Sequence, residues 1–60
     1  LQVESEPRGL RLCSAVGGRV AVYDAAGRMV AQPVLPVGES VIVPLSAGCY
    51  VVGGQKVLVR

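Results

Sequence analysis

The side chains that could do chemistry are few: two cysteines, four carboxylates, two tyrosines and no histidine. Histidine is the usual general base near neutral pH and the commonest metal ligand, so its absence leaves serine and cysteine without an activating imidazole. Two cysteines without a histidine also fall short of the four ligands that a zinc site needs within one chain. We therefore expect no catalytic residue, no metal site and no cofactor, and we predict that the chain is not an enzyme.

The cysteines, Cys13 and Cys49, can be interpreted in two ways. A disulfide between them would close a loop of about 37 residues, which the chain-entropy treatment values at roughly 3.5–4 kcal/mol. The alternation around Cys13 argues against the bridge, because Leu10 and Leu12 share one face of a strand and Cys13 points to the other. The alternation thus favours two thiols that pack as small hydrophobic side chains, with the disulfide as the alternative.

The carboxylates have plainer uses than catalysis. Glycoside hydrolysis needs two of them about 5–10 Å apart across a sugar-sized cleft, which so short a chain hardly forms. We expect all four at solvated surface or turn positions: Glu4, Glu6, Asp24 and Glu39. Asp24 has a specific local use, because its side chain can cap the turn before Gly27.

The charged and aromatic residues do not form the pattern of a nucleic-acid binder. The net charge is +2, and the six cations are spread along the chain rather than clustered. Tyr23 and Tyr50 are the only aromatic residues, and we expect them to pack across strands rather than to stack on bases or sugars. No apolar run approaches the roughly 20 residues of a spanning helix. We expect neither a nucleic-acid partner nor a transmembrane segment.

The length and composition predict one small, folded domain. A chain of 60 residues buries only about 60% of the surface that its unfolded form exposes, so its stability is marginal. Hydrophobic residues make up 52% of it, which excludes a disordered tail. The chain begins at Leu1 and carries no apolar signal stretch. We interpret residues 1–60 as a single C-terminal domain excised from a longer secreted protein.

Turn residues divide the chain into short, valine-rich pieces. Between turns the apolar residues alternate or run together, and no uninterrupted window has the 3.6-residue spacing of a helix, so we expect strands. The expected segments are residues 1–5, 9–14, 19–24, 28–35, 40–45, 49–52 and 56–59. Short strands at this spacing predict an all-β fold, a small antiparallel β-sandwich or barrel of about six to seven strands.

Two hairpins are predicted from their turn residues. Residues 23–28 fit a four-residue turn with Gly27 in the left-handed region, and Gly53-Gly54 fits a tight turn of the primed type. The Gly-Gly pairs lack the spacing of a phosphate-binding loop and open no helix, so we interpret them as turns. Pro33 and Pro44 cannot donate a ladder hydrogen bond, which predicts sheet edges or bulges there.

Two blocks of the sequence, taken in order, resemble a known family. The first is Val20-Ala21-Val22-Tyr23-Asp24-Ala25-Ala26-Gly27-Arg28-Met29-Val30, and the second is the stretch Leu45–Arg60, which reads LSAGCYVVGGQKVLVR. From about Gly9 to Arg60 the chain resembles the C-terminal sorting domain of type IX secretion (Por secretion system) cargo proteins. Many members also open with a Pro-Asn-Pro block, which residues 1–7 lack, and have an aliphatic residue at the position of Cys49.

The resemblance implies a small immunoglobulin-like β-sandwich that serves as a sorting signal. An outer-membrane translocon would recognise it and a sortase-like protease would remove it, leaving the cargo secreted or on the cell surface after passage through the periplasm. The matched positions implied for recognition are Gly27, Gly48, Tyr50, Lys56, Val57, Leu58, Val59 and Arg60. Fold maintenance is the alternative role for these residues, and a structural or adhesive immunoglobulin-like module of a cell-surface protein is the alternative function.

The C-terminal segment supports two structural hypotheses. Val57, Leu58 and Val59 are apolar and lie between Lys56 and Arg60. They form either a terminal core strand or an exposed edge strand that adds a partner's strand by main-chain hydrogen bonds. Short unpaired edges also predict association of the domain with itself, as an edge-strand homodimer.

Overall fold

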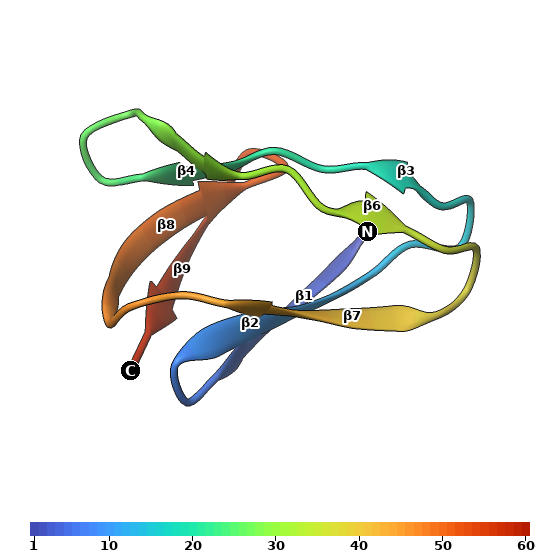
Figure 1. The fold of residues 1–60 in the computed structure, drawn as a ribbon, viewed down its shortest axis with the longest axis horizontal. Helices are drawn as coiled ribbons and strands as arrows, with labels where there is room; N and C mark the ends of the chain where they lie inside the picture. The colour runs from blue at the N-terminus through green and yellow to red at the C-terminus, as the bar shows by residue number, and fades with distance from the viewer.

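Nine short strands build the protein, and no helix is present. The computed structural model describes residues 1–60 (Figure 1). The strands are β1 (Gln2–Glu6), β2 (Gly9–Cys13), β3 (Gly18–Arg19), β4 (Val22–Asp24), β5 (Met29–Ala31), β6 (Val34–Leu35), β7 (Ser40–Pro44), β8 (Gly48–Val52) and β9 (Gln55–Val59). The predicted all-β fold is confirmed. The structure has no helix with the length and hydropathy needed to cross a membrane.

Every predicted strand segment is present, but two of them are divided. Residues 19–24 hold β3 and β4, and residues 28–35 hold β5 and β6, which accounts for nine strands where six or seven were expected. Pro33 is the physical reason in the second segment, because it has no N–H to donate to a ladder. Its carbonyl oxygen instead accepts a hydrogen bond from the Val20 N–H at 3.1 Å, between the two short pairs.

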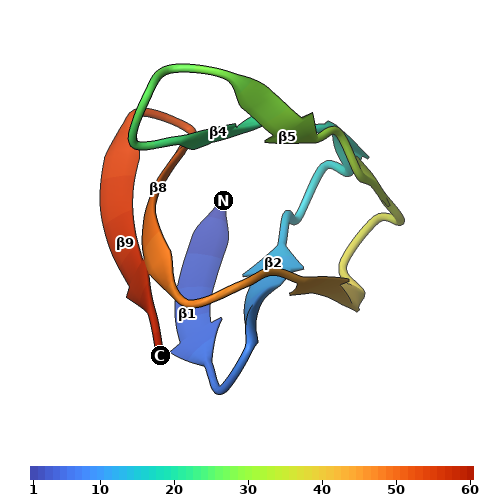
Figure 2. The same cartoon turned by 60° about the vertical axis from the view of Figure 1, so that its left-hand side comes forward.

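The strands form two antiparallel sheets and a short ribbon. One sheet has the order β1-β2-β7, the other β5-β4-β8-β9, and β3 pairs with β6. Chain order assigns these sheets to strands A-B-E and C′-C-F-G of an immunoglobulin-like sandwich. Figure 2 shows the strands surrounding a central core, with β1 beside β9 where the two sheets meet. The fold is therefore a small antiparallel β-sandwich.

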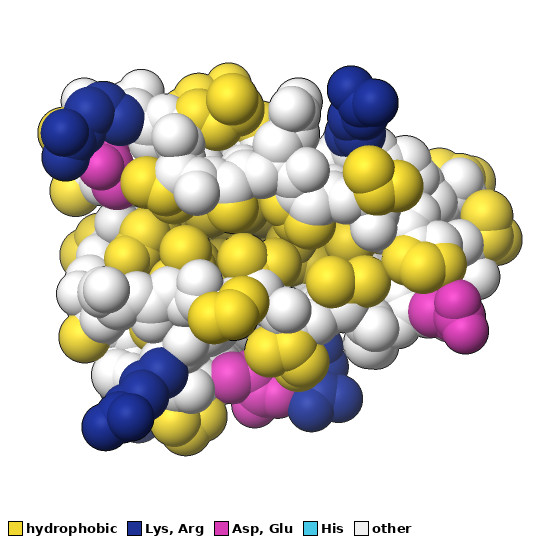
Figure 3. All heavy atoms as spheres, in the orientation of Figure 1, with side chains coloured by type: hydrophobic (Ala, Val, Ile, Leu, Met, Phe, Trp, Pro, Cys, Tyr) yellow, Lys and Arg dark blue, Asp and Glu magenta, His cyan; other side chains and the backbone are white.

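Aliphatic side chains from both sheets fill the core. Leu10 and Leu12 are fully buried while Arg11 between them is exposed, which confirms the predicted faces of β2. The buried hydrophobic set is Leu10, Leu12, Val22, Leu35, Val43, Tyr50, Val52 and Val59. Full burial of one such aliphatic side chain contributes about 1.5–3 kcal/mol. In the space-filling view, further apolar side chains form a band across one face, with the charged groups around it (Figure 3).

Both predicted hairpin turns are confirmed. Gly27 has a φ of 83°, and the Asp24 carboxylate accepts hydrogen bonds from the N–H groups of Ala26 and Arg28, each at 2.9 Å. Gly53 and Gly54 have φ values of 55° and 81°, so both central residues adopt the positive φ that a type I′ turn requires. The second turn fixes the register of β8 and β9, because it places Val52 opposite Gln55.

The first turn has its positive φ at a residue other than glycine. In Pro7-Arg8-Gly9 it is Arg8 that has a φ of 63°. Gly9 is required for a different reason, because a Cβ atom there would lie 2.6 Å from the Val43 carbonyl oxygen on β7. Pro44 ends the edge strand β7, as predicted, whereas Pro33 lies between two strands.

Candidate functional site

The residues singled out for recognition gather mainly on the hairpin of β8 and β9. Gly48 lies opposite Val59 and Tyr50 lies opposite Val57 in the register of the two strands. Gly27 lies in the β4–β5 turn and reaches the same region, because Asp24 at the start of that turn is opposite Tyr50. The structure therefore brings together the two sequence blocks, which the 14 residues 31–44 separate along the chain.

Three of these residues line one hollow on the outer side of the four-stranded sheet. The hollow has a volume of about 450 Å³, and Gly27, Tyr50 and Lys56 contribute to its wall. Its other lining residues are Tyr23, Asp24, Ala25, Cys49 and Val51. The walls are mostly apolar, and the Lys56 amine is the cation among them.

Sequence reasoning missed Tyr23, Cys49 and Val51 as members of this hollow. Strand alternation could have shown that Val22, Tyr50 and Val52 face the core, which sends their neighbours to the outer face. The pairing of β4 with β8 then aligns Tyr23, Val51 and Lys56 in one row across three strands. That alignment depends on long-range register and has no signal in the local sequence.

Tyr50 is held inside the domain by its own hydroxyl group. Its side chain is 8% exposed, and the hydroxyl donates a hydrogen bond to the Ser46 carbonyl oxygen at 2.7 Å. A Cβ atom at Gly48 would lie 3.8 Å from the Tyr50 ring, so the ring packs against this glycine. A buried tyrosine near the start of strand F that bonds back to the preceding corner is the tyrosine corner of immunoglobulin-like sandwiches. Tyr50 and Gly48 thus stabilise the fold.

β9 is both a core strand and a sheet edge. Val59 is buried and Val57 half-buried, while Lys56 and Leu58 are exposed on the opposite face. β9 ends the order of its sheet and pairs only with β8. Residues 57–59 therefore form a core strand through Val57 and Val59, and they are at the same time the last strand of their sheet.

The side of β9 that lies beside β1 carries main-chain groups that β8 does not use. In an antiparallel ladder closed by a two-residue turn, alternate residues direct their N–H and C=O groups away from the partner strand. The main-chain groups of Lys56 and Leu58 therefore face outward, and the Leu58 carbonyl oxygen accepts a hydrogen bond from the Ser5 hydroxyl of β1. Farther along, the Arg60 carbonyl oxygen accepts one from the Arg8 N–H at 2.9 Å. The Lys56 N–H and C=O have no partner on this side.

The charged groups near the hollow are partly paired. Arg28 and Asp24 form an ion pair at 3.3 Å, and Arg11 and Glu6 form another at 2.7 Å, whereas Lys56 has no ion-pair partner. The hydrogen bond from the Arg28 N–H holds the pKa of the Asp24 carboxyl below its ordinary value. Partial burial raises this pKa, whereas the Ala26 N–H and the Arg28 guanidinium lower it further. The uncompensated charge beside the hollow is therefore the Lys56 ammonium group.

Both cysteines are free thiols, Cys13 half-buried on β2 and Cys49 exposed on β8. The prediction of two unbridged thiols is confirmed, and the structure does not contain the alternative disulfide. The expectation that both thiols pack as small hydrophobic side chains is wrong for Cys49, because its side chain is exposed on the outer face of β8.

Comparisons of the chain with protein-family models, with curated proteins and with solved structures found no match. The geometry offers three means of binding: free main-chain groups on β9, an apolar hollow beside them and an unpaired amine between the two. These features suit recognition of another chain.

Proposed function

We propose that this domain is a non-catalytic sorting signal that a type IX outer-membrane translocon binds at β9. One observation carries the proposal. The two sequence blocks that resemble the sorting family meet at one hollow, which Gly27 of the first block lines together with Tyr50 and Lys56 of the second. This hollow adjoins β9 at Lys56, so recognition at β9 also involves both blocks.

The proposed recognition is addition of a strand to a sheet edge. Main-chain hydrogen bonds supply affinity in this mode, and pockets for alternate side chains supply specificity. The outward groups of Lys56 would provide the hydrogen bonds, and the hollow of about 450 Å³ has room for an apolar side chain of the partner. The unpaired Lys56 favours a partner with an acidic group at the matching position.

Two further steps belong to the proposal. The sortase-like protease would cut before β1, because the backbone from Gln2 onward is engaged in a sheet and is poorly accessible to a protease. The cargo would then be released or attached at the cell surface, after passage through the periplasm.

The test exploits the direction in which single main-chain groups point. Lys56→Pro removes an outward N–H from β9 and leaves the ladder with β8 intact, which a proline at a sheet edge allows. Ile42→Pro is the matched control, because Ile42 occupies the corresponding outward position on β7, the edge of the other sheet. Each variant is fused behind an exported reporter in a host with the type IX apparatus, and the cells are fractionated.

We expect the Lys56→Pro reporter to accumulate in the periplasm and the Ile42→Pro reporter to reach the surface. Thermal denaturation of the two isolated domains checks that both variants are folded. Equal surface display of the two variants would contradict recognition at β9. It would favour the second candidate, a structural or adhesive module, which the immunoglobulin-like strand order also accommodates.

A further inference from the structure

Of the four strands that end the two sheets, β7 is the one suited to pair with a copy of itself. β1 contains Glu4 and Glu6, and β9 contains Lys56, so pairing either strand with its own copy brings like charges together. β5 has only three residues, and its register with β4 shifts at a bulge. Charge, short length and bulges are the usual means by which natural sheets keep an edge unpaired. β7 has five residues, an unbroken register with β2 and no charged side chain.

The outer edge of β7 presents unused main-chain groups and an apolar side chain. The tight turn between β1 and β2 determines which residues of β2 bond to β1. The alternate residues Leu10 and Leu12 bond to β7, which leaves the N–H and C=O groups of Ser40 and Ile42 directed away from the sheet. The Ile42 side chain is aliphatic, yet it is 52% exposed. This edge therefore offers hydrogen bonds and apolar surface at the same residue.

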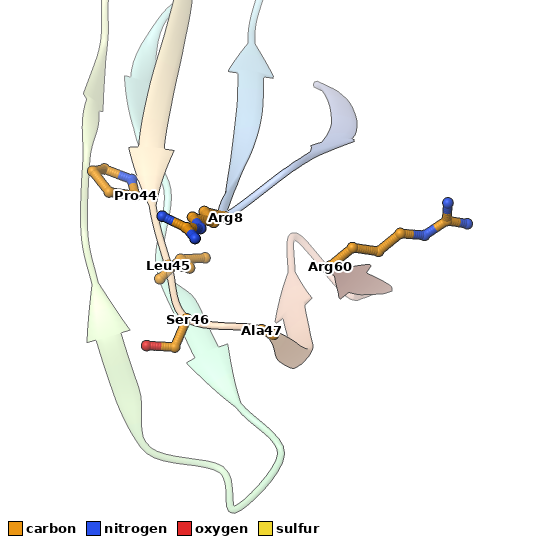
Figure 4. A pocket seen from close by; sticks show the side chains of 6 residues that line it. All are labelled: Arg8, Pro44, Leu45, Ser46, Ala47 and Arg60. Atoms are coloured by element: carbon orange, nitrogen blue, oxygen red, sulfur yellow. The ribbon is translucent and has the colours of Figure 1, made fainter.

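Opposite charges lie at the two ends of β7. Glu39 precedes the strand and is exposed. Figure 4 shows the Arg8 side chain beside Pro44 and Leu45, at the end of the strand. The Arg8 carbonyl oxygen accepts a hydrogen bond from the Leu45 N–H at 2.9 Å, which fixes the main chain of Arg8 there. The ion pairs of the structure use neither Arg8 nor Glu39, so both charges are available to a partner.

We propose that β7 pairs antiparallel with β7 of a second copy, about a two-fold axis at Ile42. This register places Ile42 opposite Ile42 and Val41 opposite Val43, so apolar side chains meet on both faces of the sheet. The two Ile42 residues exchange N–H···O=C bonds, and each Ser40 N–H donates to the Pro44 carbonyl oxygen of the other copy. The ladder ends there, because Pro44 has no N–H to extend it.

The same register also matches the charges. Because the strands are antiparallel, Glu39 of each copy comes to the end of β7 where Arg8 of the other copy lies. Ion pairs related by the axis thus flank an apolar centre, which is the usual arrangement of an interface. The contact is isologous and joins two three-stranded sheets into one larger sheet. The dimer is independent of the proposed sorting function, because β9 belongs to the other sheet.

Sedimentation equilibrium of the 60-residue chain tests the dimer. One short strand pair is a small interface, so we expect a dissociation constant of roughly 10 µM to 1 mM. Ile42→Pro removes the central outward N–H and keeps the ladder with β2, and we expect it to dimerise at least about tenfold more weakly. Lys56→Pro is the matched control, because it makes the same change at the end of the other sheet, and we expect it to dimerise like the parent chain. Thermal denaturation checks that both variants are folded.

Exchange of the charges tests the register without changing the strand. Glu39→Arg and Arg8→Glu each place like charges at both ends of the pairing, so we expect each variant alone to dimerise about tenfold more weakly than the parent. A mixed dimer of the two variants has opposite charges at both ends again, and we expect an equimolar mixture to associate like the parent chain.

Three results would overturn the proposal. A parent chain that stays monomeric up to about 1 mM would leave the edge of β7 to a strand of a different protein. Equal weakening by Ile42→Pro and Lys56→Pro would place the contact elsewhere. A mixture of Glu39→Arg and Arg8→Glu that associates no better than either variant alone would exclude the antiparallel register.

Discussion

Replacing Tyr50 with phenylalanine separates its contribution to folding from any part in recognition. The change removes one hydroxyl group, which donates a 2.7 Å hydrogen bond to the Ser46 carbonyl oxygen from a side chain only 8% exposed. A hydrogen bond of this kind contributes about 1 kcal/mol net to stability. For a domain of this size, a loss of that amount lowers the melting temperature by roughly 4–8 °C.

Tyr23→Phe is the matched control for this experiment. Tyr23 is 40% exposed, and its hydroxyl makes no hydrogen bond in the structure, so we expect its removal to change the free energy of unfolding by less than about 0.5 kcal/mol. Thermal and urea denaturation of the two variants measure the difference. Equal stability of Tyr50→Phe and Tyr23→Phe would refute the tyrosine-corner assignment.

The same pair of variants also reports on recognition. The Tyr50 hydroxyl is engaged by Ser46 and is not free for a partner. We therefore expect a reporter that carries the Tyr50→Phe domain to reach the surface normally at temperatures where the domain is folded. Retention of the folded variant in the periplasm would show that a partner uses the hydroxyl.

Three further predictions concern Gly9, Asp24 and the sheet edges. Gly9→Ala places a Cβ atom 2.6 Å from the Val43 carbonyl oxygen, and we expect urea denaturation to show a loss of about 1–3 kcal/mol, whereas parent-like stability would mean that the strands move apart freely. The lowered pKa of Asp24 means that the folded protein holds the Asp24 proton less tightly than the unfolded chain does. Its stabilising contribution is therefore complete above its ordinary pKa and is lost as the pH falls through the lowered folded value. We expect Asp24→Asn to flatten the decline in melting temperature at acid pH, and an identical decline would contradict this. The free edges of β5 and β7 predict concentration-dependent dimerisation in sedimentation equilibrium, which a monomer at all concentrations would exclude.

Local turn chemistry was predictable from the sequence, and tertiary contacts were not. The Asp24–Gly27 turn and the Gly53-Gly54 turn follow from residues within the turns themselves, because the cap and the positive φ values are local properties. In Pro7-Arg8-Gly9 the sequence suggests glycine as the residue with positive φ. In the structure Arg8 has the positive φ instead, and its main chain forms hydrogen bonds with Leu45 and Arg60, which lie far along the chain.

The candidate site was predictable in part. The family resemblance implies its members Gly27, Tyr50 and Lys56, and the inward and outward faces of a strand such as β2 follow from alternation. The row of Tyr23, Val51 and Lys56 requires the pairing of β4 with β8, which no local pattern specifies. The proposed functions of the eight recognition residues stay predictions, although the structure gives Tyr50 and Gly48 clear roles in the fold.

The central claim is that these 60 residues suffice as a secretion address, and cell fractionation tests it most directly. Residues 1–60 are fused to the C-terminus of an exported reporter, in a host with the type IX apparatus and in a matched strain that lacks the translocon. The account predicts reporter on the cell surface or in the medium of the first strain and in the periplasm of the second. Reporter that stays in the periplasm of both strains, while the fused domain is folded, would contradict the claim.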